Sequence, residues 1–353
     1  MNFALTAPLN LAEIPNYFKS VIATQASQLD QDADALRRAF QQLGQQGLLC
    51  LNVSTEKGGR GWQLPKISQY TEQLARYSGA LAFLQTQHQS AVSALAASAN
   101  EALYEYLPAA LTGARGIGVG FSQLRRSQSP PVTAGEVQGG YRVQGTIPWI
   151  TGFGIFQQFM LGAQLPDGRA IFALVDFVPQ PGLRFSAPMS LCALQSTQTV
   201  SATCENYFVP SEFLIDIKPA GWLQTRDRKN PLSHSFFALG CARAGLDILE
   251  AAQTESIPEI VSAYSALDEQ LNHCRTATYQ ALGSDRFQEM LTLRSQAINL
   301  AVRCAHAAVT VSRGAANYAD HPAQRVYREA LAFTVFGQNT QVMTATIEQI
   351  ARG

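Results

Sequence analysis

Histidine and cysteine side chains are the residues of this chain best suited to bind metals or to act as bases and nucleophiles. The histidines stand at positions 88, 234, 273, 306 and 321, and the cysteines at 50, 192, 204, 241, 274 and 304. The histidines form no HxxxH or HxH pair and the cysteines no CxxC pair, and metal sites commonly use such spacings. We therefore expect no metal site, and we expect most of the cysteines to be buried, reduced thiols of a cytoplasmic protein.

Glycine patterns that bind nucleotides are also missing. No GxGxxG follows a strand-like segment and no GxxxxGK[ST] occurs, so neither a Rossmann site nor a P-loop is expected. The 26 Lys and Arg residues balance the 26 Asp and Glu residues, and a neutral chain has no general attraction for nucleic acid or anionic lipid. No apolar run reaches the ~18 residues of a membrane span, and MNFALTAPLN lacks the features of a secretory signal. A small-molecule substrate is the expected partner.

Three successive segments with different patterns must position these residues. In the first, residues 1–115, apolar side chains recur at helical spacing within 36–48 and again within 67–77, which predicts helices. Residues 57–61 carry three glycines and predict a loop between the helices. We therefore expect an N-terminal helical domain over 1–115.

The pattern changes at about Gly116. Hydrophobic residues then alternate with glycine and serine, Gly139-Gly140 predicts a hairpin, and turn signals recur about every ten residues up to Pro219. Such spacing is typical of a small β-barrel or sandwich, here expected over 116–218.

The last segment, 219–353, again predicts helices. They are expected at about 235–254, 260–282, 285–313 and 323–351, enough for a C-terminal four-helix bundle. Helical, β and helical regions that follow one another indicate separate subdomains of an α+β protein.

This organisation resembles the acyl-CoA dehydrogenase family, and several local motifs share the resemblance in the same order. They are LGQQGLLCLNVSTEKGGRGW (43–62), EALYEYLPAALTGARGIGVGF (101–121), GGYRVQGTIPWITG (139–152), Val209-Pro210, ALGCARAGLDIL (238–249) and RVYREALAFTVFGQNTQVMTATIEQIAR (325–352). The hairpin that ends in Trp-Ile-Thr is the most specific of them. The resemblance implies a three-domain flavoprotein that binds FAD, with FMN as the alternative.

The resemblance also implies which residues meet the flavin. Trp149, Ile150 and Thr151 would lie beside its ring system, since an indole offers a flat face and a hydroxyl can meet a ring heteroatom. The other implied cofactor-binding residues are Phe121, Ser122, Gly314, Asn339 and Gln341. In the family a neighbouring subunit completes each FAD site, so we expect a homodimer or a tetramer. For Trp149 the alternative is a core residue at a strand end.

One family motif differs after Ser122. The family continues with Glu-Pro and then Gly-Ser-Asp, whereas this chain has Gln123-Leu124-Arg125-Arg126-Ser127. Either Arg125 and Arg126 meet phosphates or a carboxylate, or they belong to a solvated basic loop. This departure removes contacts that would align an acyl thioester.

The catalytic carboxylate of the family is missing. In most members a Glu near the C-terminus removes the α-proton of the thioester, and the matching position here is Gly337. Some members carry the base on the first bundle helix, where this chain has Ser233. Two histidines could replace it: His234, next to that position, and His88, on a helix that can face the cavity in the family. For each histidine the alternative is a structural role.

Three functions follow from these observations. The first is an FAD-dependent oxidoreductase acting on CH–CH groups of an atypical substrate, which could still be an acyl thioester. The second is a flavin-dependent monooxygenase of the same fold, in which histidines assist. The third is a homologue that binds flavin or another ligand without redox chemistry. The Trp-Ile-Thr hairpin favours the first two, and the missing Glu favours the last two.

Overall fold

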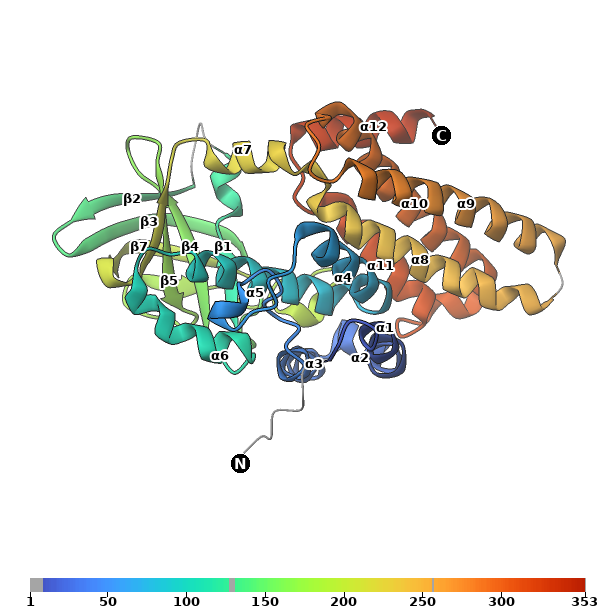
Figure 1. Ribbon diagram of the computed structural model, residues 1–353, viewed down its shortest axis with the longest axis horizontal. Helices are drawn as coiled ribbons and strands as arrows, with labels where there is room; N and C mark the ends of the chain where they lie inside the picture. The colour runs from blue at the N-terminus through green and yellow to red at the C-terminus, as the bar shows by residue number, and fades with distance from the viewer. Residues whose placement is uncertain (1–8, 127–130, 256, 353) are drawn as a thin grey trace.

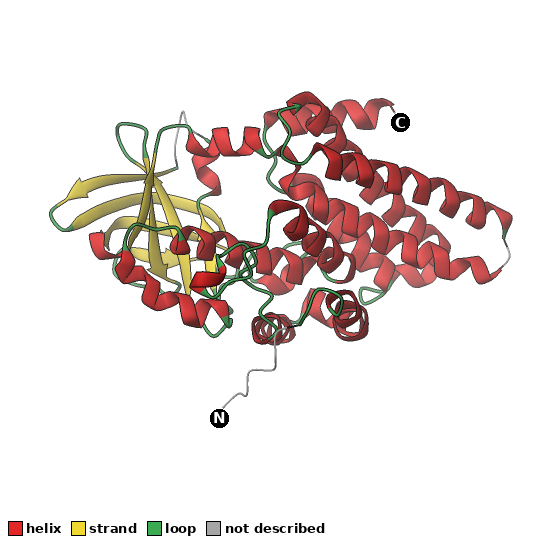
Figure 2. Cartoon of the chain, viewed as in Figure 1, coloured by secondary structure: helices red, strands yellow, loops and turns green. Residues whose placement is uncertain are grey.

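The structure, a computed structural model, describes residues 9–126, 131–255 and 257–352. Figures 1 and 2 show helices, then a β-sheet, then helices again, in the order of the chain. This order confirms the predicted α+β fold with a helical start, a β-rich middle and a helical end. None of the helices within these residues is long and apolar enough to span a membrane.

The N-terminal helices are α1 Ile14–Tyr17, α2 Ala26–Gln31, α3 Ala33–Gln45, α4 Leu64–Tyr77, α5 Gly79–Ala96 and α6 Leu107–Leu111. Helices α3 and α4 are amphipathic, as the spacing of their apolar residues predicts. Helix α3 begins after Asp32, whose side chain accepts hydrogen bonds from the backbone N–H groups of Asp34 and Ala35. Leu36, Phe40 and Leu43 form its buried face.

The predicted glycine loop separates α3 from α4. Gly58 and Gly61 have φ angles of +84° and +61°, which only glycine adopts at little cost. After this loop, α5 lies between the sheet and the C-terminal helices, where it contacts β1 and α8. Its first N–H group, on Gly79, donates to Glu329 Oε1 at 2.9 Å. The N-terminus of α5 is thereby fixed to the C-terminal helices.

The middle of the chain forms one eight-stranded sheet among the described residues. Its strands are β1 Ile117–Gly120, β2 Val132–Val137, β3 Gly140–Ile150, β4 Gln158–Gln164, β5 Ala170–Asp176, β6 Leu183–Phe185, β7 Val200–Pro210 and β8 Leu214–Lys218. The strand order is β6-β7-β3-β2-β4-β5-β8, and β1 pairs with β4 in parallel. The predicted hairpin is present: Val137 pairs with Gly140, and Gly139 turns with a φ of +81°.

The C-terminal region contains one helix more than the four predicted, beyond the linking helix α7. Its helices are α7 Trp222–Lys229, α8 Ser235–Ala251, α9 Pro258–Ala281, α10 Phe287–Ser312, α11 Pro322–Val335 and α12 Thr340–Arg352. The expectation of a single helix over 323–351 is wrong. The chain breaks at Gly337, whose φ is +53°, and Asn339 Oδ1 then accepts the N–H of Val342 as α12 begins.

The cysteines confirm the expectation for most of the thiols. Five are buried and free, and burial raises the pKa of Cys50 to about 12. Cys192 is exposed instead, in the irregular segment between β6 and β7.

Candidate active site

A cleft of about 1010 Å³ opens where α5, the sheet and the ends of the C-terminal helices meet. Its walls are built by segments that are far apart in the sequence. The lining residues are contributed by α5 (83–90), by 119–126, by 148–151, by 191–199, by 226–234 and by 331–343. Such a concave, mostly apolar site between domains is typical of a cofactor or substrate site.

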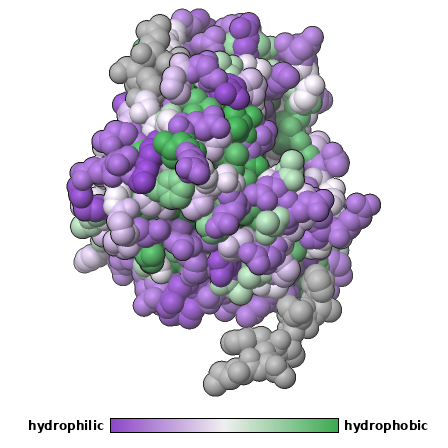
Figure 3. All heavy atoms as spheres, turned by 90° about the vertical axis from the view of Figure 1, so that its left-hand side faces the viewer, coloured by the Kyte–Doolittle hydropathy of each residue, from purple (hydrophilic) through white to green (hydrophobic). Residues whose placement is uncertain are grey.

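Five of the eight residues expected to bind the flavin line this cleft: Phe121, Ser122, Trp149, Thr151 and Asn339. The indole of Trp149 is 51% exposed, an unusual condition for the largest hydrophobic side chain unless something covers it. Figure 3, which views the molecule from the sheet end, shows hydrophobic residues gathered in the upper part of an otherwise mostly hydrophilic face.

Thr151 belongs to a short series of hydroxyl groups in the cleft wall. Its Oγ1 lies 3.1 Å from Thr199 Oγ1, which lies 3.4 Å from Thr197 Oγ1. All three threonines are buried and line the cleft. Hydroxyl groups donate or accept as their rotation allows, so this wall can adapt to a polar ring edge.

The other three expected contacts lie elsewhere. The Ile150 side chain is fully buried in the core, because successive side chains of a strand point to opposite faces. Gly314 is exposed in the 3₁₀ turn after α10, and Gln341 is exposed on α12. None of the three lines the cleft of its own chain.

His88 is a structural residue, so the expectation that it could be a base is corrected. It is fully buried on α5, its Nδ1 accepts the N–H of Ile117, and its Nε2 lies 3.0 Å from the Ala110 carbonyl oxygen. Burial lowers its pKa to about 4, so the ring is neutral and Nε2 donates. Both ring nitrogens are thus used to join α5, α6 and β1.

His234, in contrast, lines the cleft and lies beside Gly337, the residue that the family resemblance aligns with the catalytic carboxylate. A Cβ built on Gly337 would lie 2.5 Å from His234 Nδ1, closer than any real contact. The ring lies against Phe237 and Phe336, with centroid distances of 6.3 Å and 6.4 Å. The glycine at 337 is therefore matched to a histidine that fills its missing side-chain volume.

The hydrogen bonds of His234 leave one ring nitrogen for a ligand. Nδ1 lies 2.9 Å from Ser233 Oγ, whereas Nε2 has no hydrogen-bond partner among the described residues. Desolvation lowers the pKa of His234 well below its usual value, and the charges of Arg294, Arg125 and Arg226 lower it further. The imidazole is thus neutral near pH 7.

Arg294, which the sequence did not single out, connects the two backbone segments beside His234 and Gly337. Its guanidinium is almost fully buried and donates to the carbonyl oxygens of Pro231 at 2.7 Å and Phe336 at 2.5 Å. Phe336 is the C-cap residue directly after α11, so the cation hydrogen-bonds a carbonyl that has no partner within the helix. Arg294 sits within the apolar pattern of α10, where nothing in the sequence distinguishes it from a surface arginine.

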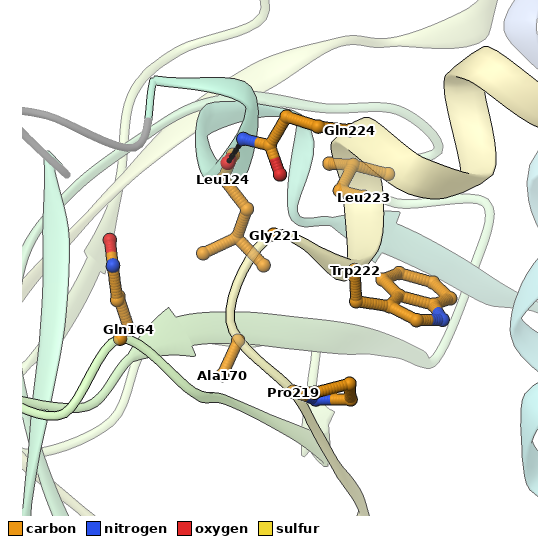
Figure 4. Close-up of a pocket in the computed structure, with 9 residues that line it drawn as sticks. Leu124, Gln164, Ala170, Pro219, Gly221, Trp222, Leu223 and Gln224 are labelled. Atoms are coloured by element: carbon orange, nitrogen blue, oxygen red, sulfur yellow. Dashed lines mark hydrogen bonds between the residues drawn. The ribbon is translucent and has the colours of Figure 1, made fainter.

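The 121–126 segment is held in place by α7. Arg125 forms a two-pronged ion pair with Asp227, at 2.6 Å and 3.0 Å, so it is neither solvated nor free. Gln224 Nε2 donates to the Leu124 carbonyl at 3.1 Å, as Figure 4 shows, beside a cavity of only about 30 Å³. That cavity is a small gap in the packing between α7 and the 121–126 segment, which contributes to the main cleft. Ser127 lies outside the described residues.

The comparisons with known proteins agree with this architecture. The sequence profile described as the acyl-CoA dehydrogenase N-terminal domain matches residues 11–114. No curated protein shows significant sequence similarity to this chain.

Three solved structures illustrate the similarity in fold. Butyryl-CoA dehydrogenase from Megasphaera elsdenii has a TM-score of 0.77 at 16% identity, covering 98% of this chain and 100% of that one. Dibenzothiophene monooxygenase from Paenibacillus sp. A11-2 has 0.75 at 17%, covering 96% and 95%. A nitrososynthase from Micromonospora carbonacea has 0.74 at 18%, covering 98% of each chain.

Proposed function

We propose that this protein is a flavin-dependent oxidoreductase that uses His234 where acyl-CoA dehydrogenases use a carboxylate. The premise is the match of residues 11–114 to the N-terminal domain profile of that family, together with the fold that the whole chain shares with its members. The observation that carries the proposal is the fit between His234 and Gly337. A histidine ring fills the volume that a side chain at 337 would need, and its Nε2 is available to a ligand in the cleft.

The cleft residues fit a flavin ring system. Trp149 presents an exposed aromatic face and the Thr151 series presents hydroxyl groups. Gln123, also in the lining, has a buried carboxamide oxygen that accepts no hydrogen bond from the described residues. Phe121, Ser122, Trp149 and Thr151 would hold the ring of FAD, or of FMN as the alternative. The bound flavin would supply hydride or electron transfer, which no side chain here can perform.

The role of His234 follows from its surroundings. Because the ring is neutral near pH 7, Nε2 can accept a proton from a substrate, while Ser233 holds the ring through Nδ1. The nearby arginines disfavour the imidazolium, so a proton taken up there is readily passed on. Arg294 holds the two backbone segments that carry the histidine and the glycine, and so fixes their separation.

A monooxygenase is the second candidate. The neutral imidazole favours it, because an uncharged ring can donate one hydrogen bond and accept another. The fold similarity to dibenzothiophene monooxygenase and to a nitrososynthase is consistent with a monooxygenase. The same similarity extends to butyryl-CoA dehydrogenase, so the fold does not choose between the two candidates.

The test begins with the purified protein, whose visible spectrum is recorded before and after dithionite and after reconstitution with FAD or FMN. We expect flavin absorption that dithionite bleaches. His234→Gln should keep the flavin and lose turnover, whereas His273→Gln, at an exposed position on α9, should behave as the wild type. A colourless protein that takes up neither flavin would overturn the proposal and favour a non-redox homologue.

A further inference from the structure

The rim of the cleft carries an excess of positive charge in a protein whose net charge is zero. Its charged lining residues are Arg125, Arg126, Arg226 and Asp227, and the neighbouring His234 is neutral near pH 7. Three cations and one anion leave this wall with a net charge of +2. A concave site lined by charge of one sign concentrates ligands of the opposite sign.

The single carboxylate of this wall already has a partner. Asp227 binds both prongs of Arg125. Arg126 and Arg226 form no ion pair with any described residue, and the stretches outside the described ranges contain no Asp or Glu. The charge of Asp227 also acts on Arg226, but within the described part of the chain neither Arg126 nor Arg226 is held in an ion pair.

The two arginines are held on ordered supports. Arg226 belongs to α7, where its guanidinium lies 5.5 Å from the Trp222 ring, a distance typical of a cation–π contact. Arg126 follows the turn Ser122–Arg125, which α7 holds through the ion pair of Asp227 with Arg125 and through the hydrogen bond of Gln224 to Leu124. Figure 4 shows the second of these contacts. The Arg226 guanidinium, which lies against the Trp222 ring, therefore loses little freedom when it binds a carboxylate or a phosphate, whereas the exposed Arg126 side chain is supported only through its backbone.

We infer that the substrate of this cleft carries an anionic group, a carboxylate or a phosphate, that binds Arg126 and Arg226 close to His234. Arg126, Arg226 and His234 all line the same cleft, and the charge of Arg226 lowers the pKa of the histidine, as expected for a guanidinium near the ring. The anionic group would then sit near the reacting end of the substrate. This inference relies on the proposed function only in taking the cleft as the substrate site.

The experiment titrates the purified protein, with its flavin content recorded, by calorimetry at constant ionic strength. The probes are succinate, inorganic phosphate and the uncharged succinamide. We expect the wild type to bind at least one of the two anions and not the amide. Arg126→Gln and Arg226→Gln should each weaken binding by roughly tenfold, because each removes a charge-assisted contact.

Lys229→Gln is the matched control, since Lys229 is an exposed cation on α7 that does not line the cleft. It should bind the anions as the wild type does. Succinate alone would identify a carboxylate and phosphate alone a phosphate; both results support the inference. The inference is overturned if the wild type binds neither anion. It is also overturned if the variant that combines Arg126→Gln with Arg226→Gln binds the anions as the wild type does.

The failure of this inference can be told apart from failure of the proposed function. His234→Gln should keep anion affinity, because the variant leaves both arginines in place. A protein that binds the anions and shows no flavin chemistry would refute the proposed function alone. A flavoprotein that turns over an uncharged substrate and ignores the anions would refute only the inference drawn from the arginines.

Discussion

The ring of His234 and a side chain at position 337 cannot share the cleft: a Cβ on Gly337 would lie 2.5 Å from His234 Nδ1. Gly337 also has a φ of +53°, which disfavours any other residue. Gly337→Ala should therefore lower the free energy of unfolding by about 1–3 kcal/mol.

A double-mutant cycle separates these two causes. In a His234→Ala background the clash is gone, so Gly337→Ala should cost at least ~0.5 kcal/mol less than it does in the wild type. Denaturant unfolding measures each variant. Strictly additive costs would mean that only backbone strain, and not the histidine, selects glycine here.

Trp149→Ala should weaken flavin retention with little effect on the fold. The indole is 51% exposed, so its removal leaves no cavity, but an aromatic stacking contact is worth about 0.5–1.5 kcal/mol beyond burial. Trp62→Ala should show the opposite, because Trp62 is 8% exposed and packs edge-on against Tyr70. Trp222→Ala serves as a second comparison. Flavin dissociation constants and melting temperatures distinguish these outcomes. Equal losses of flavin in all three variants would mean that Trp149 makes no specific contact with the flavin.

Simple straight-chain acyl-CoA thioesters should not reduce the flavin at a normal rate. Gly337 cannot accept a proton, and positioned bases typically contribute ~10²–10⁴-fold. Anaerobic stopped-flow mixing with saturated acyl-CoAs of different lengths measures the bleaching of the flavin. Rapid bleaching by any of them contradicts the prediction, and His234→Ala would then show whether the histidine is the base.

Acid should destabilise the protein in part through His88. Its pKa in the folded state is about 4, below the ordinary 6.5, so the unfolded chain binds a proton that the folded chain refuses. His88 lowers the free energy of unfolding by nothing above about pH 7 and by a growing amount as the pH falls below 6.5. The loss levels off near pH 4 at roughly 3 kcal/mol. His88→Asn should show a flatter pH dependence of unfolding between pH 6.5 and 4.5, even if it is less stable at pH 7. An imidazole resonance of His88 that titrates near pH 6.5 in the folded protein would refute this.

The chain should form a homodimer or a tetramer in solution. Leu331 and Val335 on α11, with Met343, Ile347 and Ile350 on α12, are between 47% and 62% exposed. An apolar face of this kind normally meets a partner. Light scattering at micromolar concentration should give a multiple of 38.3 kDa, and Ile347→Asp should lower the mass. A monomeric wild type would contradict the prediction.

The order of helices, sheet and helices could be read from the sequence, because the spacing of apolar residues changes period where the structure changes. The family resemblance predicted Trp149 and Thr151 as flavin contacts; both line the cleft, and their contact with a flavin stays a prediction. Local patterns could not predict that Ile150, between them, faces the core, although the alternation of a strand would have indicated it. The break at Gly337 was also not predicted, although Gly337 and Asn339 are residue types that commonly end one helix and begin the next.

The different surroundings of the two histidines became visible only in the folded chain. His88 and His234 have comparable polar neighbours in the sequence, yet one bonds the backbone through both nitrogens and the other fills the space beside Gly337. Arg294 and Asp227 joined the site in the same way, from helices that the sequence presents as ordinary. Contacts between residues about 60 to 100 positions apart, such as those of His234 with Gly337 or of Arg125 with Asp227, depend on how the helices pack against the sheet. Periodicity predicts each helix and strand, but the free energy that selects one packing arrangement is a property of the whole chain.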